Sequence, residues 1–288
     1  NIARKTAAES FVLLKNEGNI LPLKKSGSIA LIGPMADAKE NMTGTWSVAA
    51  VGDNSTSLRK GLEAVAGKDV VVRYAKGSNL IGDAAIEERA TMFDKSIGRD
   101  NRTDDEMMAE ALEIAKSSDV IIAAMGETAE FSGESASRTN LDIPDVQKTL
   151  LMELMKLGKP VVLVLFAGRP LALNWEQANV PAILDVWFGG SEAGYSIPDV
   201  LFGDVNPSGK LTTTFPQNVG QIPIYYNHKN TGRPLPEGKW FQKFRSNYLD
   251  VSNDPLYPFG YGLSYTIFEY GKLKVSSDKL KGAQTLTA

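Results

Sequence analysis

The sequence has 288 residues, of which 43% are hydrophobic and 23% are charged, a composition typical of a globular chain that buries a substantial core. The formal net charge is only -3 and the basic residues are scattered, so no basic stripe follows a phosphate backbone and nucleic acid is not an expected partner. The longest apolar run, "PVVLVLFAG", is about half of the roughly 20 residues that a membrane span needs. The absence of cysteine excludes disulfides, thiolate nucleophiles and cysteine-ligated metals.

The first segment predicts a helix that leads into a separate domain. The chain begins at Asn1 without an initiator methionine or a charged-then-apolar leader, which indicates a processed or excised piece and leaves room for a signal peptide lost upstream. Apolar residues from Ala3 to Leu14 recur at helical spacing, and Gly18 interrupts the pattern. We therefore expect residues 1–25 to form an amphipathic helix and a linker.

Residues 26–216 carry the pattern of an α/β domain. Five short apolar runs, typical of buried strands, end in glycine or polar residues: "SIALIGP", "DVVVRYAKG", "DVIIAAMGE", "PVVLVLFAG" and "AILDVWFGG". Three helical patterns lie between them: "STSLRKGLEAVAG", "DDEMMAEALEIAKSS" and "PDVQKTLLMELMKLG". This alternation predicts a three-layer α/β sandwich, with a mostly parallel sheet of about six strands and helices on both faces.

The last third of the chain has a different character. Residues 217–266 are rich in proline, glycine and aromatic side chains, which predicts an irregular extension with an apolar surface. We expect this surface to pack on the sandwich, on another domain, or on a second copy of the chain in a homodimer. In residues 267–288, apolar side chains alternate from Phe268 to Val275, which predicts the first strand of a truncated domain.

Two familiar catalytic motifs are only approximated. "GDVNPSGKL" resembles a phosphate-binding loop, but its glycine spacing is wrong and Leu211 follows Lys210 where the motif needs a hydroxyl. "GGSEAG" resembles a nucleophile elbow around Ser191, but Ala193 replaces the usual glycine and His228 is the only histidine for a triad. The scattered carboxylates match no metal-binding pattern, so we expect neither a metal nor a cofactor.

The loop "GETAEFSGESASRTNLDIP" is the strongest candidate site. It follows a predicted central strand, and ligands of parallel α/β sheets bind at the carboxyl ends of the strands. Glu127, Glu130 and Glu134 lie on this loop. Carboxyl groups held in a cleft can have their pKa raised by burial or by one another, as a general acid requires. Glutamates on a loop are also commonly solvated, so residue type alone leaves both interpretations open.

Trp46 follows the first predicted strand of the sandwich, in "TGTWSV". Its ring either packs against its own loop or offers a surface on which a planar, apolar face of a ligand stacks. Its position at a strand end favours the second interpretation, although tryptophans are more often structural.

Several long motifs together carry a resemblance to a known family. They are "ARKTAAESFVLLKNEGNILPL", "SIALIGPMAD", "MGETAEFSGESASRTNLDIP", "GKPVVLVLFAGRPLAL", "WFGGSEAG", "DVLFGDVNPSGKLTTTFP" and "YPFGYGLSYTIFEY". In this order they closely resemble glycoside hydrolase family 3, and most of all its bacterial three-domain β-glucosidases. The resemblance covers about Asn1 to Tyr270.

The resemblance implies a division of labour between domains. Such enzymes place a (β/α)8 barrel first, then the α/β sandwich, then a fibronectin type III-like domain. The barrel supplies the nucleophilic aspartate of a retaining mechanism, and the sandwich supplies the acid/base glutamate. The barrel motif is absent from this sequence, so the resemblance implies that the chain alone is inactive. It also implies a terminal β-glucosyl or β-xylosyl substrate and a periplasmic or secreted location.

The family pattern assigns roles to individual residues. The acid/base glutamate matches Glu134 in "SGESASR", with Glu130 as the runner-up because loop lengths vary. Trp46 matches a tryptophan that forms one wall of the subsite beyond the scissile bond. Ser132 and Arg138 are implied substrate-site neighbours that orient the loop. Glu127 is too close to the strand end and organises the loop.

Two other functions remain open. The chain is alternatively a non-catalytic carbohydrate-binding or scaffolding domain, which tight sugar binding without a barrel would favour. A self-sufficient α/β hydrolase is the third interpretation, and the imperfect motifs at Ser191 and Lys210 argue against it.

Overall fold

The computed structural model describes residues 2–90 and 97–287. The sheet has six strands in the order β1-β6-β5-β4-β2-β3. The strands are β1 (Val12–Asn16), β2 (Gly27–Ile32), β3 (Val70–Ala75), β4 (Val120–Gly126), β5 (Val161–Phe166) and β6 (Ala182–Asp185). β1 is antiparallel to β6, and all other neighbours are parallel. The predicted α/β fold is therefore confirmed.

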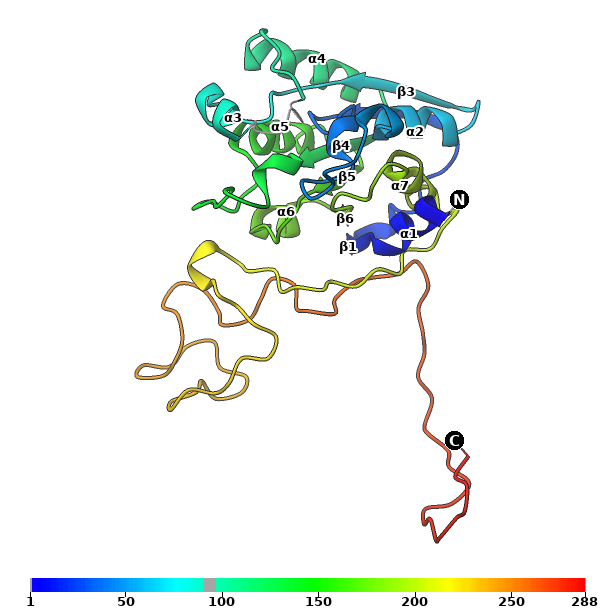
Figure 1. Cartoon of the computed structure of the whole chain (residues 1–288), viewed down its shortest axis with the longest axis vertical. Coiled ribbons are helices and arrows are strands. Elements are labelled where there is room, and N and C mark those ends of the chain that lie inside the picture. The colour runs from blue at the N-terminus through cyan, green and yellow to red at the C-terminus, as the bar shows by residue number, and fades with distance from the viewer. Residues whose placement is uncertain (1, 91–96, 288) are drawn as a thin grey trace.

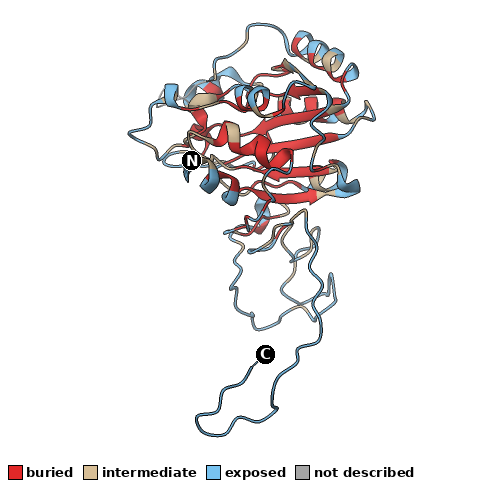
Figure 2. Ribbon diagram, turned by 90° about the vertical axis from the view of Figure 1, so that its right-hand side faces the viewer, coloured by how far each residue is buried: buried red, intermediate tan, exposed pale blue. Residues whose placement is uncertain are grey.

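Helices cover both faces of the sheet (Figure 1). They are α1 (Ile2–Ser10), α2 (Leu58–Val65), α3 (Ala84–Ala90), α4 (Asp104–Lys116), α5 (Asp145–Met155), α6 (Asn174–Asn179) and α7 (Ala193–Leu201). One apolar cluster joins α1, α2 and α7 to one face of the sheet, and a second cluster joins α4 and α5 to the other. The central strands are buried on both faces, as Figure 2 shows in red. Their near-continuous apolar sequences follow from this double burial.

The expected helix from Ala3 to Leu14 is only partly correct. It ends at Ser10, and Val12–Asn16 form strand β1 on the edge of the sheet. A helix would bury only one face of this segment, whereas Val12, Leu13 and Leu14 are all fully buried. The expected linker and the domain boundary at residue 26 are therefore wrong, because β1 belongs to the sandwich.

The extension packs on the sandwich at its two ends. Phe215 N–H donates to Tyr257 O (2.9 Å), and Leu263 N–H donates to Leu13 O (2.8 Å), which covers the outer edge of β1. Between these anchors the chain projects from the sandwich (Figure 1) and carries exposed aromatic side chains, including Trp240 and Phe244. Packing of this part on another domain or in a homodimer stays a prediction.

The expected strand from Phe268 to Val275 is not formed. The described residues 267–287 contain neither a strand nor a helix and are exposed along their length. A strand gains its backbone hydrogen bonds from a neighbouring strand, and none lies beside this segment. That the segment begins a fibronectin type III-like domain stays a prediction.

Candidate functional site

The candidate site lies where two adjacent strands lead to opposite faces of the sheet. β2 and β4 are parallel neighbours, with Ile32 beside Ala123. The chain continues from β2 to α2 on one face and from β4 to α5 on the other. Loops that diverge in this way leave a crevice at the carboxyl ends of the strands. The loops that carry Trp46 and the three glutamates both start there.

Two glycines let these loops leave the sheet. Gly33 has φ 129° and Gly126 has φ 131°, a region that side chains rarely adopt. A Cβ atom would lie 2.1 Å from Ala124 O at Gly33 and 1.9 Å from Phe166 O at Gly126. Gln147 of α5 fixes the second exit, because its Oε1 accepts from Gly126 N–H at 2.8 Å. The start of the glutamate loop (residues 126–144) is thereby set by close backbone packing at Gly126 and by the side chain of Gln147.

The three glutamates of this loop have different surroundings. Glu127 is fully buried and Glu130 is 7% exposed, in a short 3-10 turn from Ala129 to Phe131. Glu134 is exposed. The next residue, Ser135, has φ 59°, so the chain turns sharply directly after Glu134. Of the three carboxyls, that of Glu134 is the one presented to solvent.

Glu127 is held by two arginines. The Arg138 guanidinium donates to Oε1, and Arg169 Nε lies 3.3 Å from Oε2. Burial raises the pKa of Glu127, while the two arginines oppose this shift by favouring the charged carboxylate. Arg169 also donates to Phe131 O and, at 2.6 Å, to Ala136 O. This ion-pair cluster therefore ties both ends of the loop around Glu134 to the loop after β5.

The loop after β2 clamps the glutamate loop from the other side. Asn41 Oδ1 accepts from Ala129 N–H at 2.8 Å. Thr45 Oγ1 donates to Ala129 O and lies 2.9 Å from Ser132 O. These contacts join the two loops across the crevice.

Trp46 lies beside the candidate acid. Its side chain is 71% exposed, and its Nε1 would be 3.4 Å from a Cβ atom at Gly133, the residue before Glu134. The ring is thus an exposed surface next to the glutamate and does not serve as a core side chain. The structure brings together the two residues that the sequence singled out on separate loops.

Ser132 and Arg138 have contacts within the loop. Ser132 is 7% exposed, and its hydroxyl donates to Ala129 O at 3.2 Å. A Cβ atom at Gly168 would lie 2.0 Å from Ser132 Oγ, so that glycine makes room for the serine. These contacts agree with an orienting role for both residues, and their contact with substrate stays a prediction.

Sequence reasoning missed three residues that position the loop. Arg169 comes from the loop after β5, and Asn41 and Thr45 come from the loop after β2, so their distance in the sequence from the glutamate loop carries no signal. "FAGRP", which contains Arg169, follows a predicted strand and offered the one available hint.

A cavity of about 410 Å³ opens beside Glu134. It is lined by the glutamate loop, by Thr45 and by residues 81–90 around α3. Within residues 2–90 and 97–287, no three histidine, aspartate or glutamate side chains are grouped so that they would hold a metal ion. Exposed carboxylate, indole and adjoining cavity together have the chemistry of a site for proton transfer to a neutral, partly apolar ligand.

The fold is that of a domain of carbohydrate-active hydrolases, as the match to a family model shows. The chain matches the family model described as "Glycosyl hydrolase family 3 C-terminal domain" over residues 11–265. It therefore belongs to glycosyl hydrolase family 3, through the C-terminal domain of that family.

Named relatives agree with this assignment. The chain is 46% identical to the "Periplasmic beta-glucosidase" of Salmonella typhimurium over 99% of its own length and 37% of that protein. It is 36% identical to a "Beta-xylosidase" of Formosa agariphila over 99% of its length and 36% of that protein. The chain thus spans slightly more than a third of the length of each of these two relatives.

A solved structure shares the fold. The β-glucosidase of Listeria innocua, crystallised in complex with isofagomine, superposes with a TM-score of 0.80 at 37% sequence identity. The match covers 96% of this chain and 34% of that protein. The likeness extends through the sandwich and most of the extension.

Proposed function

We propose that the chain supplies the general acid/base of a retaining, exo-acting β-glucosidase-like enzyme. The substrate is a terminal, non-reducing β-D-glucosyl or β-xylosyl residue, as the names of the relatives support. The nucleophilic aspartate comes from a (β/α)8 barrel outside this chain. A periplasmic or secreted location is supported by the name of the Salmonella relative, and no helix in the described residues is long and apolar enough to cross a membrane.

The exposure of Glu134 carries this proposal. In a retaining enzyme the acid/base and the nucleophile are about 5 Å apart, on either side of the glycosidic bond. If the nucleophile is on another domain, the acid must stand at the surface of its own domain. Glu134 does so, whereas Glu127 and Glu130 are buried. The turn at Ser135 and the clamps from Arg169 and Thr45 hold its loop in place.

In this mechanism Glu134 acts twice. As an acid it protonates the leaving oxygen while the nucleophile attacks the anomeric carbon, and the bond between that carbon and the oxygen breaks. As a carboxylate it then takes a proton from the water that hydrolyses the glycosyl-enzyme. Trp46, beside Gly133, offers a face on which the departing sugar or aglycone stacks.

Azide rescue tests the role of Glu134. In the full enzyme that includes the barrel, we expect Glu134→Ala to lower kcat/KM on cellobiose by about 10²- to 10⁴-fold, the usual contribution of general acid catalysis. Hydrolysis of 2,4-dinitrophenyl β-glucoside needs little acid assistance in its first step and should be spared there. Added azide should then accelerate turnover and yield the β-glucosyl azide.

Glu130→Ala is the matched control. It should give no azide product, and rescue of this variant instead would move the acid/base role to Glu130. Wild-type turnover of cellobiose by Glu134→Ala would contradict the proposal. Sugar binding by a wild-type full enzyme that hydrolyses no glycoside would support the non-catalytic carbohydrate-binding alternative.

A further inference from the structure

The cavity beside Glu134 has one wall that the proposed mechanism does not use. This α3 cavity is lined on one side by the glutamate loop, including Phe131 and Glu134, and on the other by Ile81, Ile86 and Arg89. Ile86 is 39% exposed, so its apolar side chain is open to an occupant. In Figure 1, α3 and the loop after β4 lie at the same end of the sandwich.

The apolar wall continues beyond this cavity. A neighbouring cavity of about 670 Å³ shares Ile81 and Ile86 and extends to Ile143 and to Met152 on α5. Met152 is 40% exposed. A ligand that starts at Glu134 and lies along α3 would therefore meet the apolar side chains of Ile81, Ile86 and Met152, with charged groups such as Arg89 and Lys148 at the same walls.

The wall formed by Ile81 and Ile86 is held at its N-terminal end by hydrogen bonds to its backbone. Gln147 Nε2 donates to Leu80 O at 2.7 Å, and Gly82 N–H donates to Asp145 Oδ1 at 3.2 Å. Arg99 donates to Ile81 O at 2.9 Å and to Gly82 O at 2.8 Å. The backbone around Ile81 is thus fixed to α5 and to Arg99.

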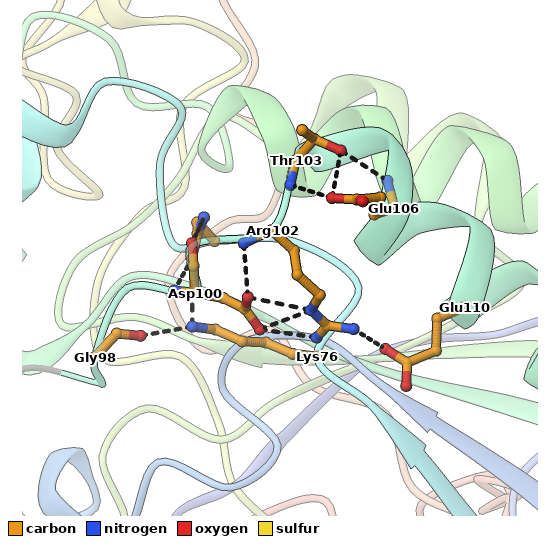
Figure 3. A network of polar contacts seen from close by, with 8 residues as sticks. Lys76, Gly98, Asp100, Arg102, Thr103, Glu106 and Glu110 are labelled. Atoms are coloured by element: carbon orange, nitrogen blue, oxygen red, sulfur yellow. Dashed lines mark hydrogen bonds and ion pairs between the residues drawn. The ribbon is translucent and has the colours of Figure 1, made fainter.

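The segment around Arg99 (residues 98–102) is itself bonded to the end of strand β3. Lys76, just after β3, donates to Gly98 O at 2.6 Å, and Asp100 pairs with Arg102 at 2.8 Å in the network of Figure 3. Arg99 also pairs with Glu87 of α3 at 2.7 Å. Residues 81, 82 and 87 are therefore bonded to Arg99, and α3 is held as a structured wall.

We propose that α3 selects the leaving group, favouring β-glycosides of apolar alcohols and phenols over those of small or polar ones. This inference rests on the proposed function, because the leaving oxygen must lie within hydrogen-bond reach of Glu134. The group attached to that oxygen then enters the cavity that Glu134 shares with Ile81 and Ile86. Burial of apolar surface there stabilises the bound substrate in proportion to the area removed from water, which favours larger aglycones.

A pair of substrates with similar leaving-group acidity tests the inference in the full enzyme. We expect the wild type to show a higher kcat/KM for 2-naphthyl than for phenyl β-glucoside, because the second ring adds apolar area. Ile86→Ser should reduce this ratio by about five- to tenfold, as expected for the loss of a contact with a buried ring. Ile86→Leu, which keeps the apolar volume, should retain the ratio.

Val71→Ser is the remote control. Val71 is also an exposed apolar residue, at 52%, but it lies on strand β3 and lines neither cavity. The variant Val71→Ser should therefore keep the wild-type ratio of kcat/KM for 2-naphthyl and phenyl β-glucoside. An unchanged ratio in Ile86→Ser, or an equal loss in Val71→Ser, would overturn the role of α3 while glucoside hydrolysis itself still supports the proposed function. A wild-type enzyme that cleaves no glycoside would overturn both.

Discussion

Asp185 is a fully buried carboxyl at the end of β6. Its Oδ1 accepts from Trp187 N–H at 3.2 Å, and its Oδ2 has no hydrogen-bond partner among the residues that the structure describes. Burial raises the pKa of Asp185 well above its usual value, and the single backbone hydrogen bond offsets this only in part. Because the folded state holds the proton more tightly than the unfolded state, protonation of this group stabilises the fold.

The sign of this linkage gives a prediction for Asp185→Asn. The stabilisation from protonated Asp185 is complete below the unfolded pKa of about 3.9 and is lost as pH rises toward the higher folded pKa. Asparagine keeps the acceptor for Trp187 and carries no charge. We expect the variant to gain about 1 kcal/mol relative to the wild type between pH 5 and pH 8, measured by chemical denaturation at each pH.

Asp250→Asn serves as the control, since Asp250 is exposed in the extension and its replacement should leave the pH profile unchanged. A stability difference between Asp185→Asn and the wild type that shrinks with rising pH would contradict the expected sign.

At the scale of single residues, the sequence indicated a carboxylic acid in the candidate site. Physical argument from the sequence did not tell the three glutamates of the loop apart. Glu127, Glu130 and Glu134 are three or four residues apart on one loop, and nothing in their spacing separates a buried carboxyl from an exposed one. The buried carboxylate of Glu127 is paired with Arg138 and Arg169, and the second of these lies on another loop. Only the family resemblance favoured Glu134 beforehand, and its catalytic role stays a prediction.

At the scale of structural elements, hydrogen bonds from Thr45 join the loop after β2 to the loop after β4. Thr45 provides one hydroxyl for the carbonyls of Ala129 and Ser132, on the turn that precedes Glu134. Valine has a similar shape but no donor, so Thr45→Val would leave these carbonyls without that partner. Because small displacements of a catalytic group are costly, the effect on rate should exceed the effect on folding.

We expect Thr45→Val to lower the free energy of unfolding by about 1 kcal/mol and kcat/KM on aryl glucosides by about tenfold in the full enzyme. Thr45→Ser retains the hydroxyl and should stay close to the wild type in both measurements. Unaltered kinetics in the valine variant would show that the clamp does not position Glu134.

The elements themselves were largely predictable, and the exceptions have physical causes. Five strands follow from apolar runs ended by glycine or polar residues, but β1 was mistaken for the end of a helix. Its residues from Phe11 to Leu14 are apolar throughout, and such a short run fits either structure until its neighbours are known. β6 on one side and Leu263 on the other supply the partners that make it a strand.

At the scale of the whole molecule, the order of strands decides which loops meet. The sequence predicts that several loops lie at the carboxyl edge of the sheet, but not that β2 and β4 are neighbours. That neighbourhood depends on long-range pairing, which local patterns do not contain. It places Trp46 beside Glu134 and joins two separate motifs in one candidate site.

The proposed division of the active site between domains yields the final prediction. The chain by itself carries the candidate acid and the α3 cavity, but no group here is assigned as the nucleophile that forms the glycosyl-enzyme. We expect the isolated chain to release no nitrophenol from p-nitrophenyl β-glucoside, and activity to appear when it is joined to its barrel domain in one polypeptide. The same fusion carrying Glu134→Ala should regain glycosyl transfer only with azide. Turnover by the isolated chain, abolished by a substitution at Ser191, would instead establish a self-sufficient hydrolase and place the chemistry at the start of α7.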